Sequence, residues 1–194
     1  MTLYIWRHPK PLHAAGLCLG QTDVGVEQRK LRRLANQIQG FARRHRLPKE
    51  VWVSPLQRSR GVGTILAARG FRCNLAPALA EVNFGHWDGR PWQQIPRAEI
   101  DAWCERFADH APGGGENLHQ LFARVEGWLA TLENQPQLAV GHAGWINAAR
   151  LLAAGRGVPT QAGDWPRPVA YRALSVLTIP AALPAPVPPP PVSC

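Results

Sequence analysis

Short apolar runs alternate with longer polar segments along most of the chain, and the two patterns predict different elements. The runs are rich in β-branched and aromatic residues, which is typical of buried strands. They are LYIW from Leu3, EVWV from Glu50, the weaker FRCNL from Phe71, QLAVG from Gln137 and LSVLT from Leu174.

In the longer segments, apolar residues recur every three or four positions, as on one face of a helix. Leu31, Leu34 and Ile38 are one such set. The segments that we predict to be helical are 27–46, 56–69, 117–132 and 143–154.

Strand-like runs that alternate with helical segments are typical of an α/β layer fold. We therefore expect a three-layer α/β/α sandwich with a mainly parallel central sheet, formed by one domain over residues 1–179. From Pro180 on, the sequence PAALPAPVPPPPVSC disfavours helix and central strand, because each proline lacks a backbone N–H donor. Residues 180–194 are predicted to be a disordered, proline-rich tail.

The balance of charge favours anionic partners. The chain has 22 Lys and Arg against 13 Asp and Glu, a formal net charge of +9, which suits nucleic acid or small phosphorylated molecules. The basic stretch KLRRLANQIQGFARRHR is interpreted as the solvated face of a helix, since no nucleic-acid-binding motif accompanies it. We expect a small phosphorylated substrate and no nucleic-acid partner.

Other features argue against several classes of protein. No apolar run is long enough to span a membrane and no signal peptide is recognisable, so we expect no membrane partner and a cytoplasmic location. The four cysteines are far apart, which predicts reduced thiols. His86, His110 and His119 are too scattered to predict a metal site, and no cofactor is expected. No feature indicates an oligomeric state.

Polar residues follow three of the predicted strands. Arg7 and His8 end the first strand, Arg58 lies in SPLQRSR after the second, and His142 ends QLAVGH. Parallel α/β sheets place function at the carboxyl ends of their strands, so these residues are candidates for one pocket. Each residue alone has an ordinary structural interpretation, as a strand end, a surface arginine or a turn histidine. Their joint occurrence at strand ends favours a site.

Two arginines and two histidines at one sheet edge suit a phosphate dianion. Guanidinium groups present a planar fork of donors that matches phosphate oxygens. A histidine beside permanent positive charge stays neutral, so its imidazole can act as a nucleophile. Attack on phosphorus would form a phosphohistidine and divide hydrolysis into two steps.

Five segments in order resemble the motifs of the histidine phosphatase superfamily, of the phosphoglycerate mutase-like or branch 1 type. They are WRHPKP, SPLQRSR, AEVNFGHWDGR, GGGEN and AVGHAG. The resemblance implies a phosphoglycerate mutase-like fold, His8 as the phosphorylated nucleophile, and Arg7, Arg58 and His142 as the phosphate pocket. It also implies that Glu81 donates a proton to the leaving group, for which Phe84 and Trp87 are expected to shelter it from water. No metal is implied.

The resemblance extends to the loops around the phosphate. Gln21 and Thr22, in GQTDV, and Ala143, beside His142, are expected to bind substrate together with Arg7, Arg58 and His142. Several positions depart from the family pattern. Among them, Pro9 stands where glycine is usual, Ala14 where many members have asparagine, and Asn117 where serine is common. Lys10, His13 or Thr22 are candidates to replace the missing contact.

Within the family, the chain most resembles the α-ribazole phosphatases, which implies a phosphomonoesterase acting on α-ribazole 5′-phosphate in cobalamin nucleotide-loop assembly. The candidates to line the substrate pocket are Trp87, Arg90, Trp92, Trp103 and Glu116, and the alternative for the aromatic ones is a place in the core. A broad sugar- or nucleotide-phosphate phosphatase is the alternative within the same fold. A phosphoglycerate mutase-like enzyme is disfavoured by the short segment before GGGEN. An inactive anion or nucleic-acid binder is disfavoured because all five catalytic positions carry competent residues.

Overall fold

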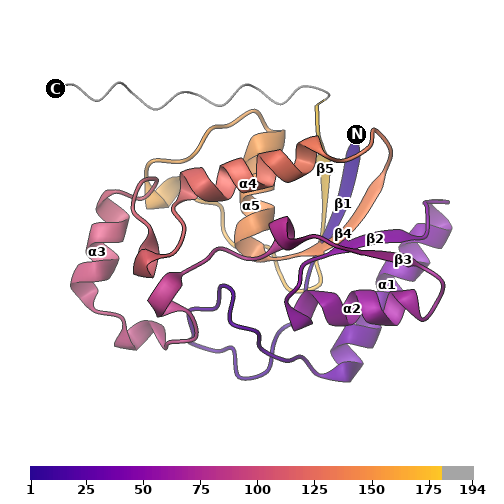
Figure 1. Cartoon of the computed structure of the whole chain (residues 1–194), viewed down its shortest axis with the longest axis horizontal. Coiled ribbons are helices and arrows are strands. Elements are labelled where there is room, and N and C mark those ends of the chain that lie inside the picture. The colour runs from indigo at the N-terminus through magenta and orange to yellow at the C-terminus, as the bar shows by residue number, and fades with distance from the viewer. Residues whose placement is uncertain (181–194) are drawn as a thin grey trace.

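The computed structural model describes residues 1–180. Nearly all of the predicted proline-rich tail, residues 181–194, lies outside the described residues. A five-stranded sheet forms the centre, in the order β3-β2-β4-β1-β5 (Figure 1). Its strands are β1 Thr2–Arg7, β2 Glu50–Val53, β3 Arg72–Leu75, β4 Gln137–Gly141 and β5 Leu174–Thr178. β5 runs antiparallel to β1 and the other pairs are parallel, so the predicted strands and the mainly parallel sheet are confirmed.

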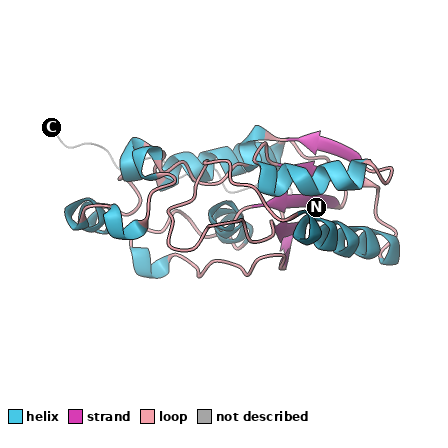
Figure 2. Cartoon of the chain, turned by 90° about the horizontal axis from the view of Figure 1, so that it is seen from below, coloured by secondary structure: helices cyan, strands magenta, loops and turns pink. Residues whose placement is uncertain are grey.

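Four of the helices match predicted segments, and one was missed. The helices are α1 Gln28–Arg44, α2 Gln57–Ala67, α3 Arg97–Glu105, α4 Leu118–Ala130 and α5 Ala143–Ala153. No residue of α3 is fully buried, and only two of its apolar side chains, Ile100 and Trp103, pack against core clusters. Its apolar face is therefore too short to be recognised in the sequence. Both views place α3 at the end of the molecule away from the sheet (Figure 1 and Figure 2).

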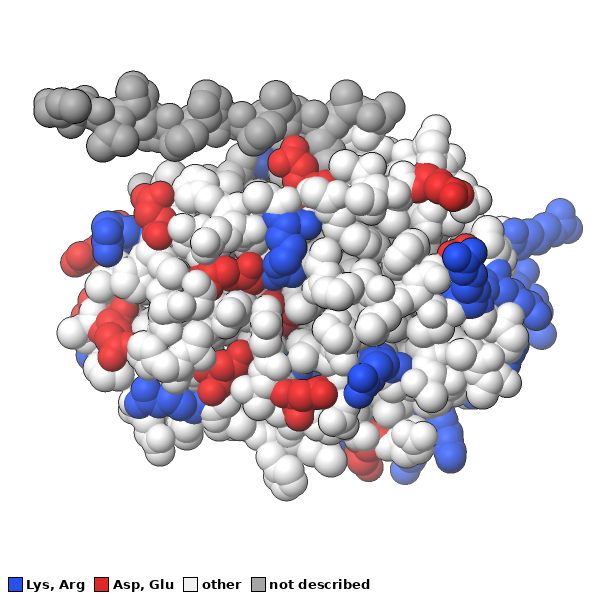
Figure 3. Space-filling model, in the orientation of Figure 1, with Lys and Arg blue, Asp and Glu red and all other residues white. Residues whose placement is uncertain are grey.

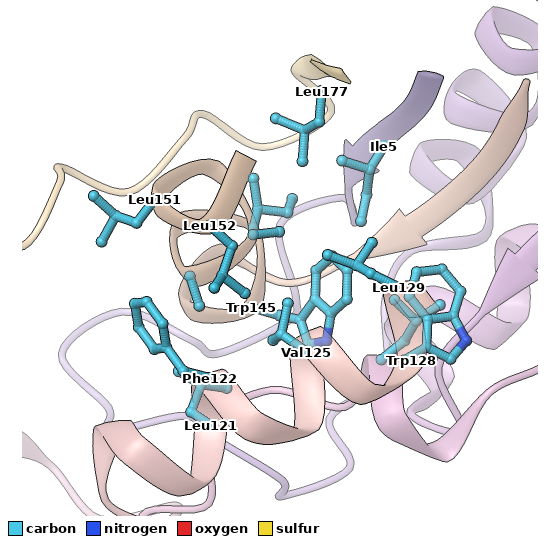
Figure 4. Packing of buried hydrophobic residues seen from close by; sticks show 14 of the residues in the cluster. Ile5, Leu121, Phe122, Val125, Trp128, Leu129, Trp145, Leu151, Leu152 and Leu177 are labelled. Carbon is cyan, nitrogen blue, oxygen red and sulfur yellow. The ribbon is translucent and has the colours of Figure 1, made fainter. Parts of the chain in front are cut away.

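Helices cover both faces of the sheet, as β1 illustrates. Successive side chains of a strand point to opposite faces. Ile5 packs with residues of α4 and α5, whereas Trp6 packs with residues of α1 and α2. Figure 4 shows the first of these cores, where Trp128 of α4 and Trp145 of α5 lie with Ile5 and with Leu177 of β5. The predicted three-layer sandwich is therefore confirmed.

The segment between β3 and α4 extends the domain beyond the sheet and ends in a well-formed helix cap. The Asn117 side chain accepts from the Gln120 N–H, and the Gln120 side chain accepts from the Asn117 N–H, each at 2.9 Å. This capping box satisfies two N–H groups at the start of α4. Asn117 therefore caps α4.

The surface is basic along α1. Its last turn carries Arg43 and Arg44, both exposed, and Figure 3 shows Lys and Arg side chains gathered on the side of the molecule where α1 ends. The solvated basic helix face is therefore confirmed. Within residues 1–180, no helix is long and apolar enough to cross a membrane.

Candidate active site

The carboxyl ends of the central strands bring the predicted residues together. Arg7 ends β1 and is followed by His8, while Ser54 follows β2 and His142 follows β4. The His8 N–H donates to the Gly141 carbonyl at 3.0 Å, which continues the pairing of β1 with β4. The ring centroids of His8 and His142 are 4.9 Å apart. The two histidines therefore face one another at the sheet edge.

His8 has one ring nitrogen engaged and the other available. Its Nδ1 lies 2.7 Å from the Pro9 carbonyl oxygen, and because a carbonyl only accepts, Nδ1 must carry the hydrogen. The lone pair of the neutral ring is then on Nε2. Pro9 costs the loop a backbone N–H, but it retains the carbonyl that orients the ring.

Both histidines are held neutral by their surroundings. Burial, followed by the charges of Arg58 and Arg7, lowers the pKa of His8 well below its ordinary value. Burial, followed by the proximity of His8 and by the charges of Arg58 and Arg7, lowers the pKa of His142 as well. A neutral His8 is what a nucleophilic imidazole requires.

Arg58 is fully buried near the start of α2, where it faces the loop that contains Gln21 and Thr22. It donates to the Thr22 carbonyl at 2.8 Å and to the Gly20 carbonyl. These bonds engage two of the five N–H donors of a guanidinium, so donors remain for an anion. Burial lowers the pKa of Arg58, a cost that a bound dianion would offset.

Asp88 orders the same loop, and sequence reasoning missed it. Its carboxylate accepts the backbone N–H groups of Gly20 at 3.0 Å, Thr22 at 3.1 Å and Gln21. The N–H groups of Gln21 and Thr22 are thus occupied, so only their side chains could reach a substrate. The Gln21 side-chain amide already donates to the Glu81 carbonyl at 3.2 Å. The W-D-G motif of the sequence was the signal that could have identified Asp88.

Arg7 is held by the segment before β5. It donates through Nη1 to the Val169 carbonyl at 2.6 Å, and its guanidinium carbon lies 3.9 Å from the centroid of the Tyr171 ring. The buried Nε has no partner among the described residues. The Tyr171 ring also lies 5.7 Å from the His8 ring. Tyr171 is therefore a site residue for which the sequence carried no signal.

Glu81 lies at the N-terminus of α5. Its carboxylate accepts from the N–H groups of Val82 at 3.0 Å, Trp145 at 3.2 Å and Gly144 at 3.2 Å. A Cβ atom on Gly144 would lie 2.6 Å from the carboxylate, so only glycine allows this approach. Glu81 is buried, as expected, and its carboxylate is hydrogen-bonded by backbone N–H groups.

Arg124 of α4 fixes the backbone that carries Glu81. It donates to the carbonyls of Ala78 at 2.8 Å and Ala80 at 2.9 Å. It also donates to the Glu116 carboxylate at 2.5 Å. Sequence reasoning missed Arg124, since it lies in the middle of a helix with no motif around it.

A cavity of about 400 Å³ adjoins these groups. It is lined by Arg7 and Glu81, by the first residues of α5, Ala143 and Gly144, and by Ala14. Most of the remaining wall is apolar. Its aromatic side chains are Phe84, Trp92, Trp103, Phe107, Trp165 and Tyr171.

The predicted lining residues are confirmed in part. Trp92, Trp103 and Glu116 line the cavity. Trp87 does not, because it is fully buried and donates through Nε1 to Glu99 at 2.6 Å. Arg90 does not line it either, since its guanidinium donates to the Gln94 carbonyl. The prediction for Arg90 was wrong, whereas Trp87 has the core position that was the alternative for the aromatic candidates.

The site combines groups suited to binding a phosphate with a histidine suited to attacking it. Two guanidinium groups and two neutral imidazoles meet beside a buried carboxylate and a helix N-terminus, which suits a phosphate group. Within residues 1–180, no group of three or more His, Cys, Asp or Glu residues is arranged to hold a metal ion. The fold and the site together define an α/β enzyme that acts on phosphorylated compounds.

The sequence model of the histidine phosphatase superfamily (branch 1) matches residues 3–182. The chain belongs to this superfamily and is a phosphatase. A comparison with curated proteins finds no match.

Several solved structures are similar to the chain. TTHB049 from Thermus thermophilus is 29% identical over 89% of this chain and 98% of that chain, with a TM-score of 0.63. The alpha-ribazole phosphatase from Shigella flexneri is 26% identical over 93% and 91%, with a TM-score of 0.70. A mycobacterial glucosyl-3-phosphoglycerate phosphatase in complex with VO3 is 25% identical over 91% and 92%, with a TM-score of 0.71.

The two buried histidines predict a loss of stability in mild acid. Their pKa values in the folded protein lie below the ordinary 6.5, so below pH 6.5 the unfolded chain binds protons that the folded chain does not. Their contribution to the free energy of unfolding is fully present above pH 6.5. It is lost as the pH falls towards the pKa values of the folded protein, by up to about 1.4 kcal/mol per pH unit for each histidine.

Thermal unfolding at pH 7.5 and pH 5.5 measures this effect. The melting temperature should fall less in His142→Asn than in the unmodified protein, whereas His45→Asn, at an exposed position, should show the full decrease. An equal decrease in all three proteins would exclude His142 as a cause.

Proposed function

We propose that the chain hydrolyses phosphomonoesters through a phosphohistidine on His8, with α-ribazole 5′-phosphate as its favoured substrate. The observation that carries the proposal is the available Nε2 of a neutral His8 beside the guanidinium groups of Arg7 and Arg58. A cytoplasmic location and a role in cobalamin nucleotide-loop assembly are further predictions that accompany this choice of substrate.

In the first step, Nε2 of His8 attacks phosphorus and the bond from phosphorus to the leaving oxygen breaks. Arg7, Arg58 and His142 bind the non-bridging oxygens, where charge is stabilised in the transition state. Glu81 donates a proton to the leaving oxygen, so that the product departs as an alcohol.

The N-terminus of α5 supports this binding. The N–H groups of Gly144 and Trp145 donate to Glu81, and that of Ile146 donates to the His142 carbonyl at 2.9 Å. Among the described residues the Ala143 N–H has no such partner, so it can donate to a phosphate oxygen. The side chains of Gln21 and Thr22 complete the proposed phosphate site.

In the second step, water attacks the phosphorus of the phosphohistidine. Glu81, ionised after the first step, accepts a proton from this water, and the bond from Nε2 to phosphorus breaks. Inorganic phosphate leaves, and His8 returns to its neutral form with Nδ1 still donating to the Pro9 carbonyl.

The cavity supports the choice of substrate. A flat aromatic base can stack on walls such as Trp92, Trp103 and Tyr171. Arg7 is the one cation among the described lining residues, and it belongs to the phosphate clamp. An acidic leaving group such as a glycerate would therefore lack a cationic partner. The alpha-ribazole phosphatase among the similar structures supports the same choice.

The test is a comparison of kcat/KM for α-ribazole 5′-phosphate, sugar phosphates, nucleotides and 3-phosphoglycerate. We expect kcat/KM for α-ribazole 5′-phosphate to be at least tenfold higher than for the sugar phosphates and 3-phosphoglycerate. This ratio corresponds to about 1.4 kcal/mol of stacking free energy. Trp92→Leu should reduce this preference, and Trp52→Leu, which lies outside the cavity lining, should retain it.

Other outcomes favour other functions. Equal kcat/KM values across the panel would support a broad-specificity phosphatase. Salt-sensitive binding of polyanions without any hydrolysis would support an anion or nucleic-acid binder.

A further inference from the structure

The two histidines of the site are both buried and neutral, yet only one of them can be the nucleophile. His8 has its Nδ1 hydrogen donated to the Pro9 carbonyl and its Nε2 available. In His142 the Nε2 nitrogen lies 2.6 Å from the Oγ atom of Ser54, and Nδ1 has no partner among the described residues. Ser54 and His142 are both fully buried, so water does not compete for these atoms.

We propose that Ser54 is a positioning residue that donates its hydroxyl hydrogen to Nε2 of His142 and thereby keeps the ring in the Nδ1–H form. The unpartnered Nδ1–H is then the group that donates to a phosphate oxygen. His142 has no free lone pair in this form, which makes it a donor to the phosphoryl group and leaves His8 as the nucleophile. The role in catalysis rests on the proposed function, whereas the assignment of hydrogens does not.

The opposite assignment leaves two groups unsatisfied. If Nε2 carried the hydrogen and donated to Ser54, the Ser54 hydroxyl hydrogen would have no acceptor among the described residues. The bare lone pair of Nδ1 would then face the phosphate dianion. Before phosphate binds, each form leaves one buried donor unmade, but only the opposite form also leaves the Nδ1 lone pair without a partner. Once a phosphate oxygen accepts from Nδ1, only the Nδ1–H form satisfies every group, so this form is favoured in both states.

A second serine holds Ser54 in place. The Ser54 N–H donates to the Oγ atom of Ser59 at 3.0 Å, and the Ser59 hydroxyl donates to the Val140 carbonyl at 2.7 Å. Val140 lies in β4, two residues before His142. The chain of bonds therefore joins the ends of β2 and β4, and it aligns the Ser54 hydroxyl with the ring that it orients.

Nitrogen-15 NMR of histidine-labelled protein tests the assignment directly, with His142→Gln used to identify the signals. In the unmodified protein we expect His142 to be the Nδ1–H tautomer, with and without orthovanadate as the phosphate analogue. Ser54→Ala should give a mixture of tautomers, and its inhibition constant for orthovanadate should rise by the inverse of the remaining Nδ1–H fraction, about twofold to tenfold. Ser54→Thr retains a hydroxyl and should restore both properties.

Ser175→Ala, in β5, is the matched control and should change neither property. An Nε2–H tautomer of His142 in the unmodified protein would overturn the proposal. So would a Ser54→Ala protein that keeps the Nδ1–H form and binds orthovanadate as before. Because the tautomer is measured without turnover, a chain that failed to hydrolyse phosphomonoesters would contradict the proposed function and still decide the role of Ser54.

Discussion

Replacement of His8 by alanine should lower kcat for p-nitrophenyl phosphate by about a thousandfold or more, which is the scale of losing a catalytic nucleophile. The physical reason is that the available Nε2 of His8 is the atom proposed to form the bond to phosphorus. Steady-state hydrolysis measures the effect. His45→Ala is the control, because His45 is exposed at the end of α1 and its loss should leave the rate unchanged.

The same variant should lose covalent phosphate. Brief incubation of the unmodified protein with labelled substrate, followed by denaturation, should trap phosphate that is labile in acid and stable in base, as expected for phosphohistidine. His8→Ala should trap none. Full hydrolytic activity in His8→Ala, or equal labelling of the two proteins, would refute the role of His8 as nucleophile.

The second large effect is expected for Glu81→Gln. The substitution should slow the hydrolysis of alkyl phosphates about a hundredfold or more, and that of aryl phosphates much less. A poor leaving group needs the proton that Glu81 provides, whereas p-nitrophenolate leaves without it. The substitution is geometrically conservative. A glutamine oxygen in the place of Oε1 still accepts the N–H groups of Val82 and Trp145. The amide NH2 group in the place of Oε2 loses only the bond from the Gly144 N–H, because it cannot accept.

The measurement is a plot of log kcat/KM against the pKa of the leaving group, for the unmodified and substituted proteins. Its slope should become steeper in Glu81→Gln. Parallel lines would mean that Glu81 does not protonate the leaving group. Glu126→Gln, in α4 and outside the active-site cavity, should reproduce the unmodified slope.

The local sequence predicted the strands and most of the helices, and it showed which polar residues follow each strand. The strand at Leu3 and the strand at Gln137 were predictable because both faces of the sheet are buried, which requires continuous apolar runs. Arg7, His8 and His142 follow such strands directly, so their meeting at one edge followed from the parallel arrangement. α3 was missed because only Ile100 and Trp103 of this helix pack against core clusters, which is too short an amphipathic pattern to recognise.

The cavity lining was predictable only in part, since neighbouring residues of a loop point in different directions. Trp92 lines the cavity, whereas Trp87 is fully buried behind it, with its ring centroid 6.4 Å from that of Trp92. Both residues are tryptophans, and the turns between them decide the direction of each side chain.

The sequence by itself therefore determined the fold class, the strand ends and the pair of histidines. Only the tertiary structure decided which hydrogen bonds each ring makes: the Pro9 carbonyl on His8 and the Ser54 hydroxyl on His142. It also decided that Asp88 orders the phosphate loop and that Tyr171 packs on Arg7. These contacts join residues far apart in the chain, and hydrogen bonds and stacking depend on distances and directions that exist only once the strands and loops have packed.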